Sequence, residues 1–131
     1  EGYDSTEGFN GADMIPQFIL RRLYKKGSLK NTDIGIEFIL ENSLASATIT
    51  RINRISADNK DIPLPQIEIK GGSGFVKADN INENTSILFE KGKEIDVRLS
   101  TDRLTEGEHL IKVSVASKEF GELSFDIKDR V

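Results

Sequence analysis

Apolar and polar residues alternate along the C-terminal third of the chain. Every second residue is apolar within residues 94–100, 111–115 and 122–128, and the residues between them are polar. A period of two gives a β-strand one apolar face and one solvated face. Turn-forming residues such as Glu90-Lys91-Gly92-Lys93 separate these runs. The pattern therefore predicts short antiparallel strands joined as a meander or a Greek key.

Two earlier segments also have a β-like composition. Residues 15–24 are rich in Ile, Phe, Leu and Tyr and end at the turn signal Lys25-Lys26-Gly27. Residues 34–40 place four apolar side chains on one face by alternation, a pattern that Ile39 breaks mildly. We expect a strand in each segment, the second of them half buried.

Residues 43–56 fit two structures. Ile49, Ile52 and Ile55 are three residues apart, as on one face of a helix, but the segment is rich in β-branched residues, which favour extended backbone. We predict a strand with a bulge or kink, followed by an Asx-rich turn at residues 57–61.

The middle of the chain carries more turn signals. Pro63 and Pro65 require an edge or pre-strand position before the alternating residues 67–70. Gly71 to Gly74 predict a hairpin loop, and residues 75–83 predict a long irregular loop.

Together these elements amount to seven or eight short strands without a major helix. Strands alternating with helices, which build parallel sheets, are absent from the pattern. We predict an all-β fold, an antiparallel β-sandwich of the immunoglobulin-like or jelly-roll-like kind, spanning residues 15–131. Residues 1–14 predict a flexible arm, or one that becomes ordered on a partner.

Composition narrows the possible functions. The chain has 131 residues, no cysteine and a formal net charge of −4. An acidic balance argues against nucleic acid as a partner, and the chain has no apolar run long enough for a membrane helix. The polar, acidic start does not resemble a signal peptide, and the lack of cysteine suits a reducing compartment, so we expect a cytoplasmic protein.

No complete catalytic or metal-binding motif is present in the sequence. The sole histidine, His109, shares strand parity with apolar residues, which favours a structural or surface role; the alternative is a general base at a site completed by another chain. The Asx-rich run Asp79 to Asn84 could offer oxygen ligands to calcium but lacks the spacing of a calcium loop. Carboxylates fall mostly on predicted solvent faces. We therefore predict no catalytic residue and no metal ligand in this chain.

The only basic cluster contains Arg21, Arg22, Lys25 and Lys26. In a strand, Arg22 would share a side with apolar and aromatic residues, a mixture that is enriched at protein interfaces. A solvated edge strand blunted by charge accounts for the cluster equally well. The partner interface that we predict combines this segment with the N-terminal arm and contains Tyr3, Phe9, Met14, Phe18, Arg22 and Tyr24.

Two stretches carry a family resemblance. Leu40-Glu41-Asn42-Ser43-Leu44-Ala45-Ser46-Ala47-Thr48-Ile49 and Phe120-Gly121-Glu122-Leu123-Ser124-Phe125-Asp126-Ile127 resemble the small (β) subunit of bacterial C-glycoside deglycosidases. The similarity runs from about residue 10 to the end. It is weaker at residues 21–27, where Lys25 stands in place of the second of two adjacent aromatics.

The resemblance implies a heteromeric carbon–carbon lyase. Such β subunits pair with a larger α subunit that resembles sugar isomerases, has a TIM-barrel fold and binds a divalent metal, often manganese. The complex cleaves the C–C bond between a 3-oxo-sugar and a flavonoid-type aglycone by elimination, after a base removes the acidified sugar proton. The base and the metal ligands belong to the α subunit, so the resemblance implies an accessory role, without a cofactor, for this chain.

Two further functions stay open on the residues alone. A freestanding carbohydrate-binding sandwich is the main alternative, and it predicts exposed aromatic platforms, whereas the chain has no tryptophan. An independent hydrolase would need two carboxylates held across a cleft.

Overall fold

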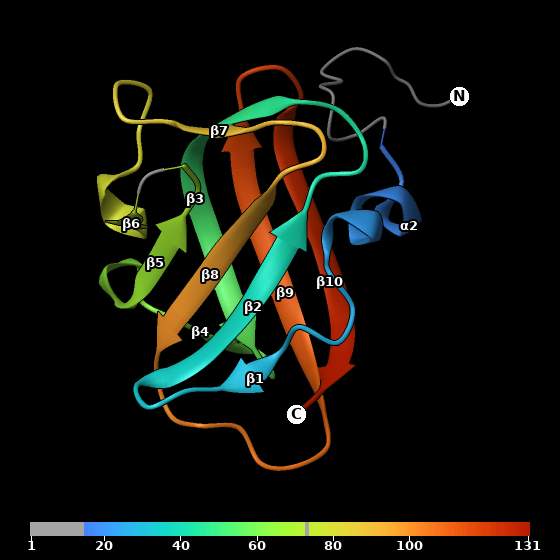
Figure 1. Ribbon diagram of the computed structural model, residues 1–131, viewed down its shortest axis with the longest axis vertical. Coiled ribbons are helices and arrows are strands. Elements are labelled where there is room, and N and C mark those ends of the chain that lie inside the picture. The colour runs from blue at the N-terminus through green and yellow to red at the C-terminus, as the bar shows by residue number, and fades with distance from the viewer. Residues whose placement is uncertain (1–14, 73) are drawn as a thin grey trace.

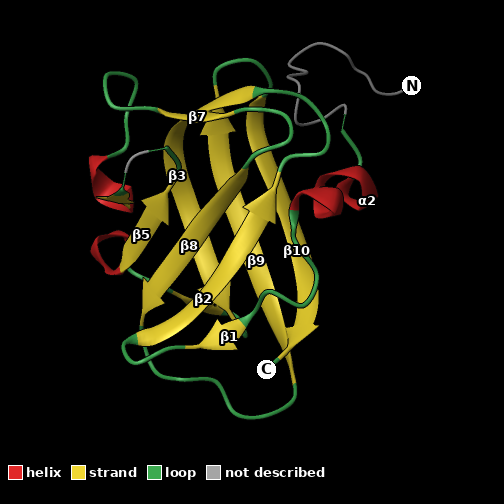
Figure 2. Cartoon of the chain, viewed as in Figure 1, coloured by secondary structure: helices red, strands yellow, loops and turns green. Residues whose placement is uncertain are grey.

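The computed structural model describes residues 15–72 and 74–131, and these residues form two antiparallel β-sheets packed face to face (Figure 1). The first sheet has the order β1-β2-β8-β5-β6. The second has the order β10-β9-β3-β4, with β7 pairing to another part of β3. The predicted all-β antiparallel sandwich is thus confirmed, and strands dominate the chain (Figure 2).

The strands of the first sheet are β1 (Lys30–Asn31), β2 (Gly35–Glu41), β8 (Glu94–Ser100), β5 (Ile67–Lys70) and β6 (Phe75–Lys77). Those of the second are β10 (Gly121–Arg130), β9 (Glu108–Ser117), β3 (Ala47–Ala57), β4 (Lys60–Asp61) and β7 (Ile87–Phe89). The helical elements are α2 (Gln17–Leu20) and the short 3₁₀ turns η1 (Arg21–Leu23), η2 (Leu64–Gln66) and η3 (Ala78–Asn80). No helix in the described ranges is long and apolar enough to cross a membrane.

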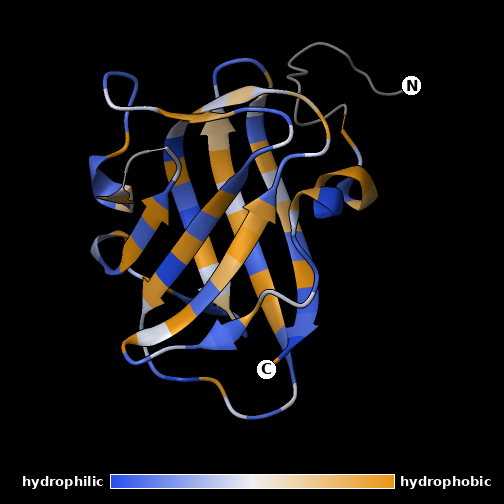
Figure 3. Ribbon diagram, in the orientation of Figure 1, coloured by the Kyte–Doolittle hydropathy of each residue, from blue (hydrophilic) through white to orange (hydrophobic). Residues whose placement is uncertain are grey.

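The alternating pattern of the sequence becomes the layering of the sandwich. In β8, Ile95, Val97 and Leu99 are buried, while the residues between them are partly exposed. The strands of both sheets show this alternation as bands of opposite hydropathy (Figure 3). Burial of one face of each sheet gives a single apolar layer between them, which is the main source of stability.

Two bulges account for the three-residue spacing in β3. Its register against β9 shifts between Ile49 and Arg51 and again between Ile52 and Arg54. Each bulge adds one residue to β3, so the inward face recurs every third residue and Ile49, Ile52 and Ile55 are all buried. The predicted strand with a bulge is confirmed.

Turns occur at most of the predicted places. Asp58 and Asn59 have φ values of 51° and 66° and form a two-residue turn between β3 and β4, as Asx residues allow. The glycine-rich loop joins the paired strands β5 and β6. The prediction of an irregular loop over residues 75–83 was partly wrong, because it contains β6 and η3. The pattern predicted seven or eight strands, and residues 15–72 and 74–131 form ten, because β1, β4 and β6 are too short to produce a clear pattern.

The prediction of a strand at residues 15–24 was wrong. These residues contain α2 and η1, and the spacing of Ile19, Leu20 and Leu23 by one, three and four positions fits a helix. We call residues 17–25 the strap, because they link the free edges of the two sheets. Arg21 binds Asp126 in β10, Tyr24 forms a bridge to Leu40 in β2, and the amide of Lys25 donates to the carbonyl of Ile39 at 3.0 Å.

A substitution at Gly35 tests how closely β2 packs against the end of β8. A Cβ atom at Gly35 would lie 2.7 Å from the amide nitrogen of Thr101 and closer still to the carbonyl oxygen of Leu99. Since both atoms are backbone, we expect Gly35→Ala to lower the free energy of unfolding by about 1–3 kcal/mol. Gly72→Ala is the matched control, because a Cβ there meets no atom within 4 Å. Urea denaturation checks both variants, and equal midpoints would contradict the predicted clash.

Candidate functional site

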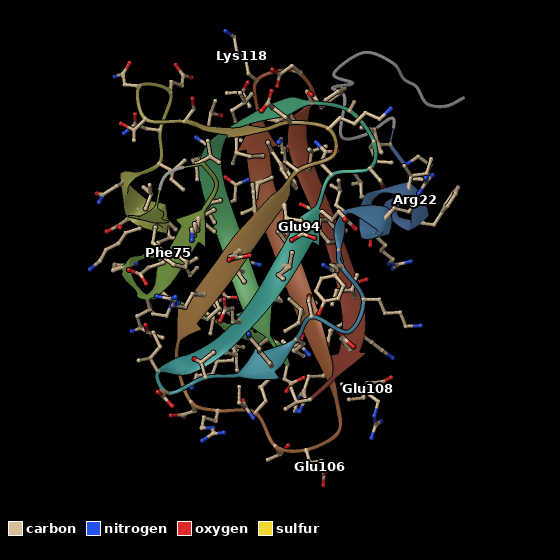
Figure 4. All side chains as sticks on the ribbon, in the orientation of Figure 1. Arg22, Phe75, Glu94, Glu106, Glu108 and Lys118 are labelled. Carbon is tan, nitrogen blue, oxygen red and sulfur yellow. The ribbon has the colours of Figure 1, made fainter. Side chains whose placement is uncertain are left out.

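The outer face of the strap carries an exposed aromatic and an exposed cation. Phe18 is 68% exposed, the highest value among the large exposed hydrophobic residues, and Arg22 is exposed as well. They are four positions apart, which places them on one face of a helical segment. Arg22 points away from both sheets (Figure 4). We call these two residues the Phe18–Arg22 face.

Arg21 fixes the direction of this face. Its Nε donates to the carbonyl oxygen of Asp126 at 2.8 Å, and its Nη2 donates to Asp126 Oδ1 at 2.8 Å. The same guanidinium donates to Gln17 Oε1 within the strap at 3.2 Å. The ion pair is half exposed, so its energy is small, but the paired contacts set the orientation of the helix on β10.

The basic cluster is divided between two roles. Arg21 and Lys25 form ion pairs with Asp126 and Glu94. Among the described residues, Arg22 and Lys26 form none. Alternation predicted that Arg22 shares a face with Phe18, Leu20 and Tyr24. Phe18 is exposed beside Arg22, but the prediction was wrong for Leu20 and Tyr24, which are buried in the helical strap.

Tyr24 anchors the C-terminal end of the strap inside the sandwich. Its side chain is buried, its ring lies 5.8 Å from that of Phe38, and its hydroxyl donates to Asp129 Oδ2 at 2.6 Å. Burial, followed by this hydrogen bond, raises the pKa of the Tyr24 hydroxyl well above its usual range. The structure therefore removes Tyr24 from the predicted interface. Tyr3, Phe9 and Met14 lie outside the described residues.

Asp129 is a buried carboxylate whose oxygens already have donors. Besides Tyr24, the amide of Gly27 donates to Oδ2 at 2.9 Å and the amide of Arg130 to Oδ1 at 2.8 Å. Burial opposes ionisation, but the hydrogen bond from Tyr24 and those from the amides outweigh it and lower the pKa of Asp129. Asp129 is therefore an anion at neutral pH that ties the strap to β10.

His109 lies between two acceptors. Its Nδ1 is 2.6 Å from Asp58 Oδ2 and its Nε2 is 2.6 Å from the carbonyl oxygen of Thr105. Only the imidazolium form donates from both ring nitrogens, so it is the form that satisfies both acceptors at once. The hydrogen bond to Asp58, then that to Thr105, raises the pKa of His109. The amide of Leu110 and then His109 itself lower the pKa of Asp58.

This arrangement favours the structural role of His109. The side chain is 8% exposed and has no free ring nitrogen with which to accept a substrate proton. Sequence reasoning did not identify Asp58 as the partner of His109. The available signal was the position of Asp58 in an Asx-rich turn, where Asx residues tolerate positive φ and often form hydrogen bonds with their side chains.

The remaining oxygen-rich segments are also engaged in local structure. Asn82 Oδ1 accepts from the amides of Asn84 and Thr85 at 2.8 and 3.0 Å, so the predicted Asx-rich loop uses its own side chain as an acceptor. The part of the chain that the structure describes contains no cluster of three His, Cys, Asp or Glu residues spaced to hold a metal ion.

An apolar cavity of about 300 Å³ lies between the two sheets, beneath the strap. The strap contributes Ile19, Leu20 and Leu23 to its lining, and the other lining residues come mostly from strands of both sheets. Among the described residues that line it, Asn42 contributes the only polar side chain, and this side chain is almost fully buried. The sequence did not indicate this cavity, because its lining residues follow the same alternation as an ordinary core.

A polar hollow lies on the outer face of the second sheet. Asn53, Lys112, Ser114, Glu122 and Ser124 contribute to its lining. Arg51 pairs with Glu122 at 3.2 Å, and Asn53 donates to the same carboxylate. The hollow offers amide, hydroxyl and charged groups, while its one aromatic lining residue, Phe125, is buried from the other side.

The fold and surface define a β-sandwich module whose open flank is closed by a helical strap with an exposed outer face. Residues 19–131 match the family model described as hydroxymethylglutaryl-CoA reductase, N-terminal domain, and the chain belongs to that family. The match covers the sandwich and the strap from residue 19 onward. No curated protein matches the chain.

We expect Tyr24→Phe to lower the free energy of unfolding by about 1.5–3 kcal/mol at pH 7, because the lost hydrogen bond has a charged acceptor. Phenylalanine keeps the ring against Phe38, so packing is preserved. Because the pKa of Asp129 is lower in the folded state, its ionised carboxylate stabilises the fold at pH values above the unfolded carboxyl pKa of about 3.9. This stabilisation is lost as the pH falls through the folded pKa of Asp129. The effect of Tyr24→Phe should therefore shrink in acid. A pH-independent difference in urea midpoints would contradict this.

The Asp58–His109 pair predicts a second pH dependence. Because the folded pKa of His109 is raised, its stabilisation is complete below the unfolded value of about 6.5 and is lost as pH rises through the folded value. Because the pKa of Asp58 is lowered in the folded state, the stabilisation by this pair begins to fall in acid once the pH drops below the unfolded pKa of Asp58, about 3.9. We expect wild-type stability to decline on the alkaline side of this window and the decline to be absent in His109→Gln. Urea denaturation from about pH 5 to about pH 9 checks this; parallel profiles would contradict it.

Proposed function

We propose that this chain is an accessory β subunit that binds a larger catalytic partner through the Phe18–Arg22 face. The observation that carries the proposal is the exposure of these two side chains on a strap whose position is fixed by Arg21 and Tyr24. Aromatic residues and arginine are the side chains that contribute most to protein–protein binding. A fixed backbone lowers the entropy cost of placing them against a partner.

The family match supports a role within a larger enzyme. The family is described as the N-terminal domain of hydroxymethylglutaryl-CoA reductase, that is, as one part of a longer protein. The same relationship would hold between this chain and a separate α subunit.

We propose further that the complex is a C-glycoside deglycosidase. This step rests on the resemblance of residues 40–49 and 120–127 to the small subunits of those enzymes. In the structure the first stretch forms the end of β2, the crossing between the sheets and the start of β3, and the second forms the start of β10. The α subunit would contribute the divalent metal, the base and most of the contacts to the sugar and the aglycone. This chain would stabilise the α subunit in the cytoplasm.

A carbohydrate-binding module is the second candidate, and the polar hollow on β3, β9 and β10 favours it. Its amide, carboxylate and hydroxyl groups are suited to sugar hydroxyls. Aromatic platforms, which sugar-binding surfaces commonly use, are not available there. Phe75, on the other sheet, has the guanidinium of Arg98 at 3.8 Å from its ring centre, so that face of the ring is covered. The accessory-subunit proposal is therefore the stronger of the two.

The test is co-expression of the full chain with the larger protein encoded beside it, followed by size-exclusion chromatography with light scattering. We expect a stable heteromeric complex that cleaves a 3-oxo-C-glycoside, and no cleavage by the chain alone. Turnover by the lone chain would contradict the accessory role. Saturable sugar binding by the lone chain, without a complex, would favour the second candidate.

Variants of the exposed face locate the interface. We expect Phe18→Ser and Arg22→Glu each to weaken association by about 2 kcal/mol or more, as interface anchors do. Their stability as isolated chains should change by less than about 0.5 kcal/mol, because both side chains are exposed. Leu88→Ser is the matched control, since Leu88 is 60% exposed on β7 and outside the strap. An unchanged complex with Phe18→Ser and Arg22→Glu would remove the strap from the interface.

A further inference from the structure

The cavity between the sheets is larger than packing defects in an ordinary core. Protein interiors are close-packed, with few voids that exceed the size of one water molecule. Here a space of about 300 Å³ lies between strands of both sheets, against side chains as buried as Ile55 and Val97. A volume of this size is at the lower end of the range of natural ligand pockets.

The cavity also opens to the surface. Most of its lining is buried, but Pro16 and Ala45 are exposed, and Ile15, Leu44 and Phe120 are partly exposed. These residues belong to the segment just before the strap, the crossing from β2 to β3 and the turn between β9 and β10. A ligand can therefore reach the space along the N-terminal end of the strap without separating the two sheets.

The lining determines the chemistry of the occupant. Carbon atoms make up nearly the whole surface, and both polar groups of the Asn42 side chain are already bonded. Asn42 Nδ2 donates to the carbonyls of Ala45 and Phe89, and Oδ1 accepts from two backbone amides. A charged or strongly polar ligand would lose its hydration without compensation. A peptide segment would bring amide and carbonyl groups that the lining cannot satisfy.

We propose that this cavity is a binding site for a small, uncharged, hydrocarbon-rich molecule. A cavity of about 150 Å³ accepts benzene, so about twice that volume corresponds to about ten to twelve carbon atoms, as in two fused rings or a medium-length chain. Recognition is by shape and by apolar surface. The site is independent of the Phe18–Arg22 face, which lies on the opposite side of the strap from the cavity.

The probe for this site is naphthalene. The chain contains no tryptophan and only two tyrosines, so naphthalene fluorescence can be followed against a low protein background. We expect the full chain to bind one equivalent saturably, seen as a rise in naphthalene anisotropy, and its melting temperature to increase with ligand concentration. Failure to reach saturation, or no change in melting temperature, would overturn the proposal. So would a crystal structure with residues 1–14 inside the cavity.

A filling variant ties the binding to this cavity. Ala47 is buried and lines it, so Ala47→Leu should weaken naphthalene binding by at least about tenfold while leaving the far-ultraviolet circular dichroism spectrum unchanged. Thr48→Leu is the matched control, because Thr48 is on the opposite face of the same strand and bonds Glu119 there. If leucine prevents folding, Ala47→Val adds less volume and should weaken binding less. Equal binding by wild type and the folded Ala47 variant would overturn the assignment.

Discussion

The two sheets depend on one buried amide at the point where the chain passes between them. Asn42 directly follows β2 of the first sheet and is only 1% exposed. Its side chain bonds Phe89 and the backbone at residues 44 and 45, while its own backbone groups bond Lys93 and Gly92. The crossings from β2 to β3 and from β7 to β8 are thus joined through one residue. An unpaired polar group in this position would cost about 1–3 kcal/mol, so the hydrogen bonds that Asn42 makes are what allow its amide to be buried at the rim of the apolar layer, beside the largely exposed crossing at residues 43–46.

The strap covers the flank of the sandwich between β10 and β2. The sandwich leaves the edge of β10 and the edge near β2 unconnected, and free strand edges invite pairing with other chains. Residues 17–25 contact both edges and add apolar side chains to the interior. The same turn of helix then presents Phe18 and Arg22 to solvent. Edge protection and the proposed interface are two faces of one short segment.

The sequence predicted the layers of the fold well, because alternation reports directly on which side of a strand is buried. It also predicted the irregularity of β3, since β-branched residues favour a strand and a three-residue spacing within a strand requires extra residues in its register. It failed at the strap, where apolar and β-compatible residues are dense and the helix is only one turn long. Local composition cannot show that both sheet edges lie close to this segment.

The side-chain contacts and the cavity were less predictable, because they too depend on which distant segments lie close together. His109 was visible as a lone histidine, but its acceptors Asp58 and Thr105 depend on how a hairpin and a loop meet. Asp129 could not be distinguished from the solvated carboxylates of other strands without knowledge that Tyr24 points at it. The cavity has no signature at all, since a gap between two apolar faces depends on their distance and not on their composition.

The strap's anchors have a consequence for the order of events during synthesis. Arg21 and Tyr24 each bind partners 105 positions further along the chain. A polypeptide is made from its N-terminus, so the strap is synthesised before the β10 residues that it binds. The other strands can therefore assemble while the flank is still uncovered. The strap can therefore dock only after β10 has been made and has joined the second sheet.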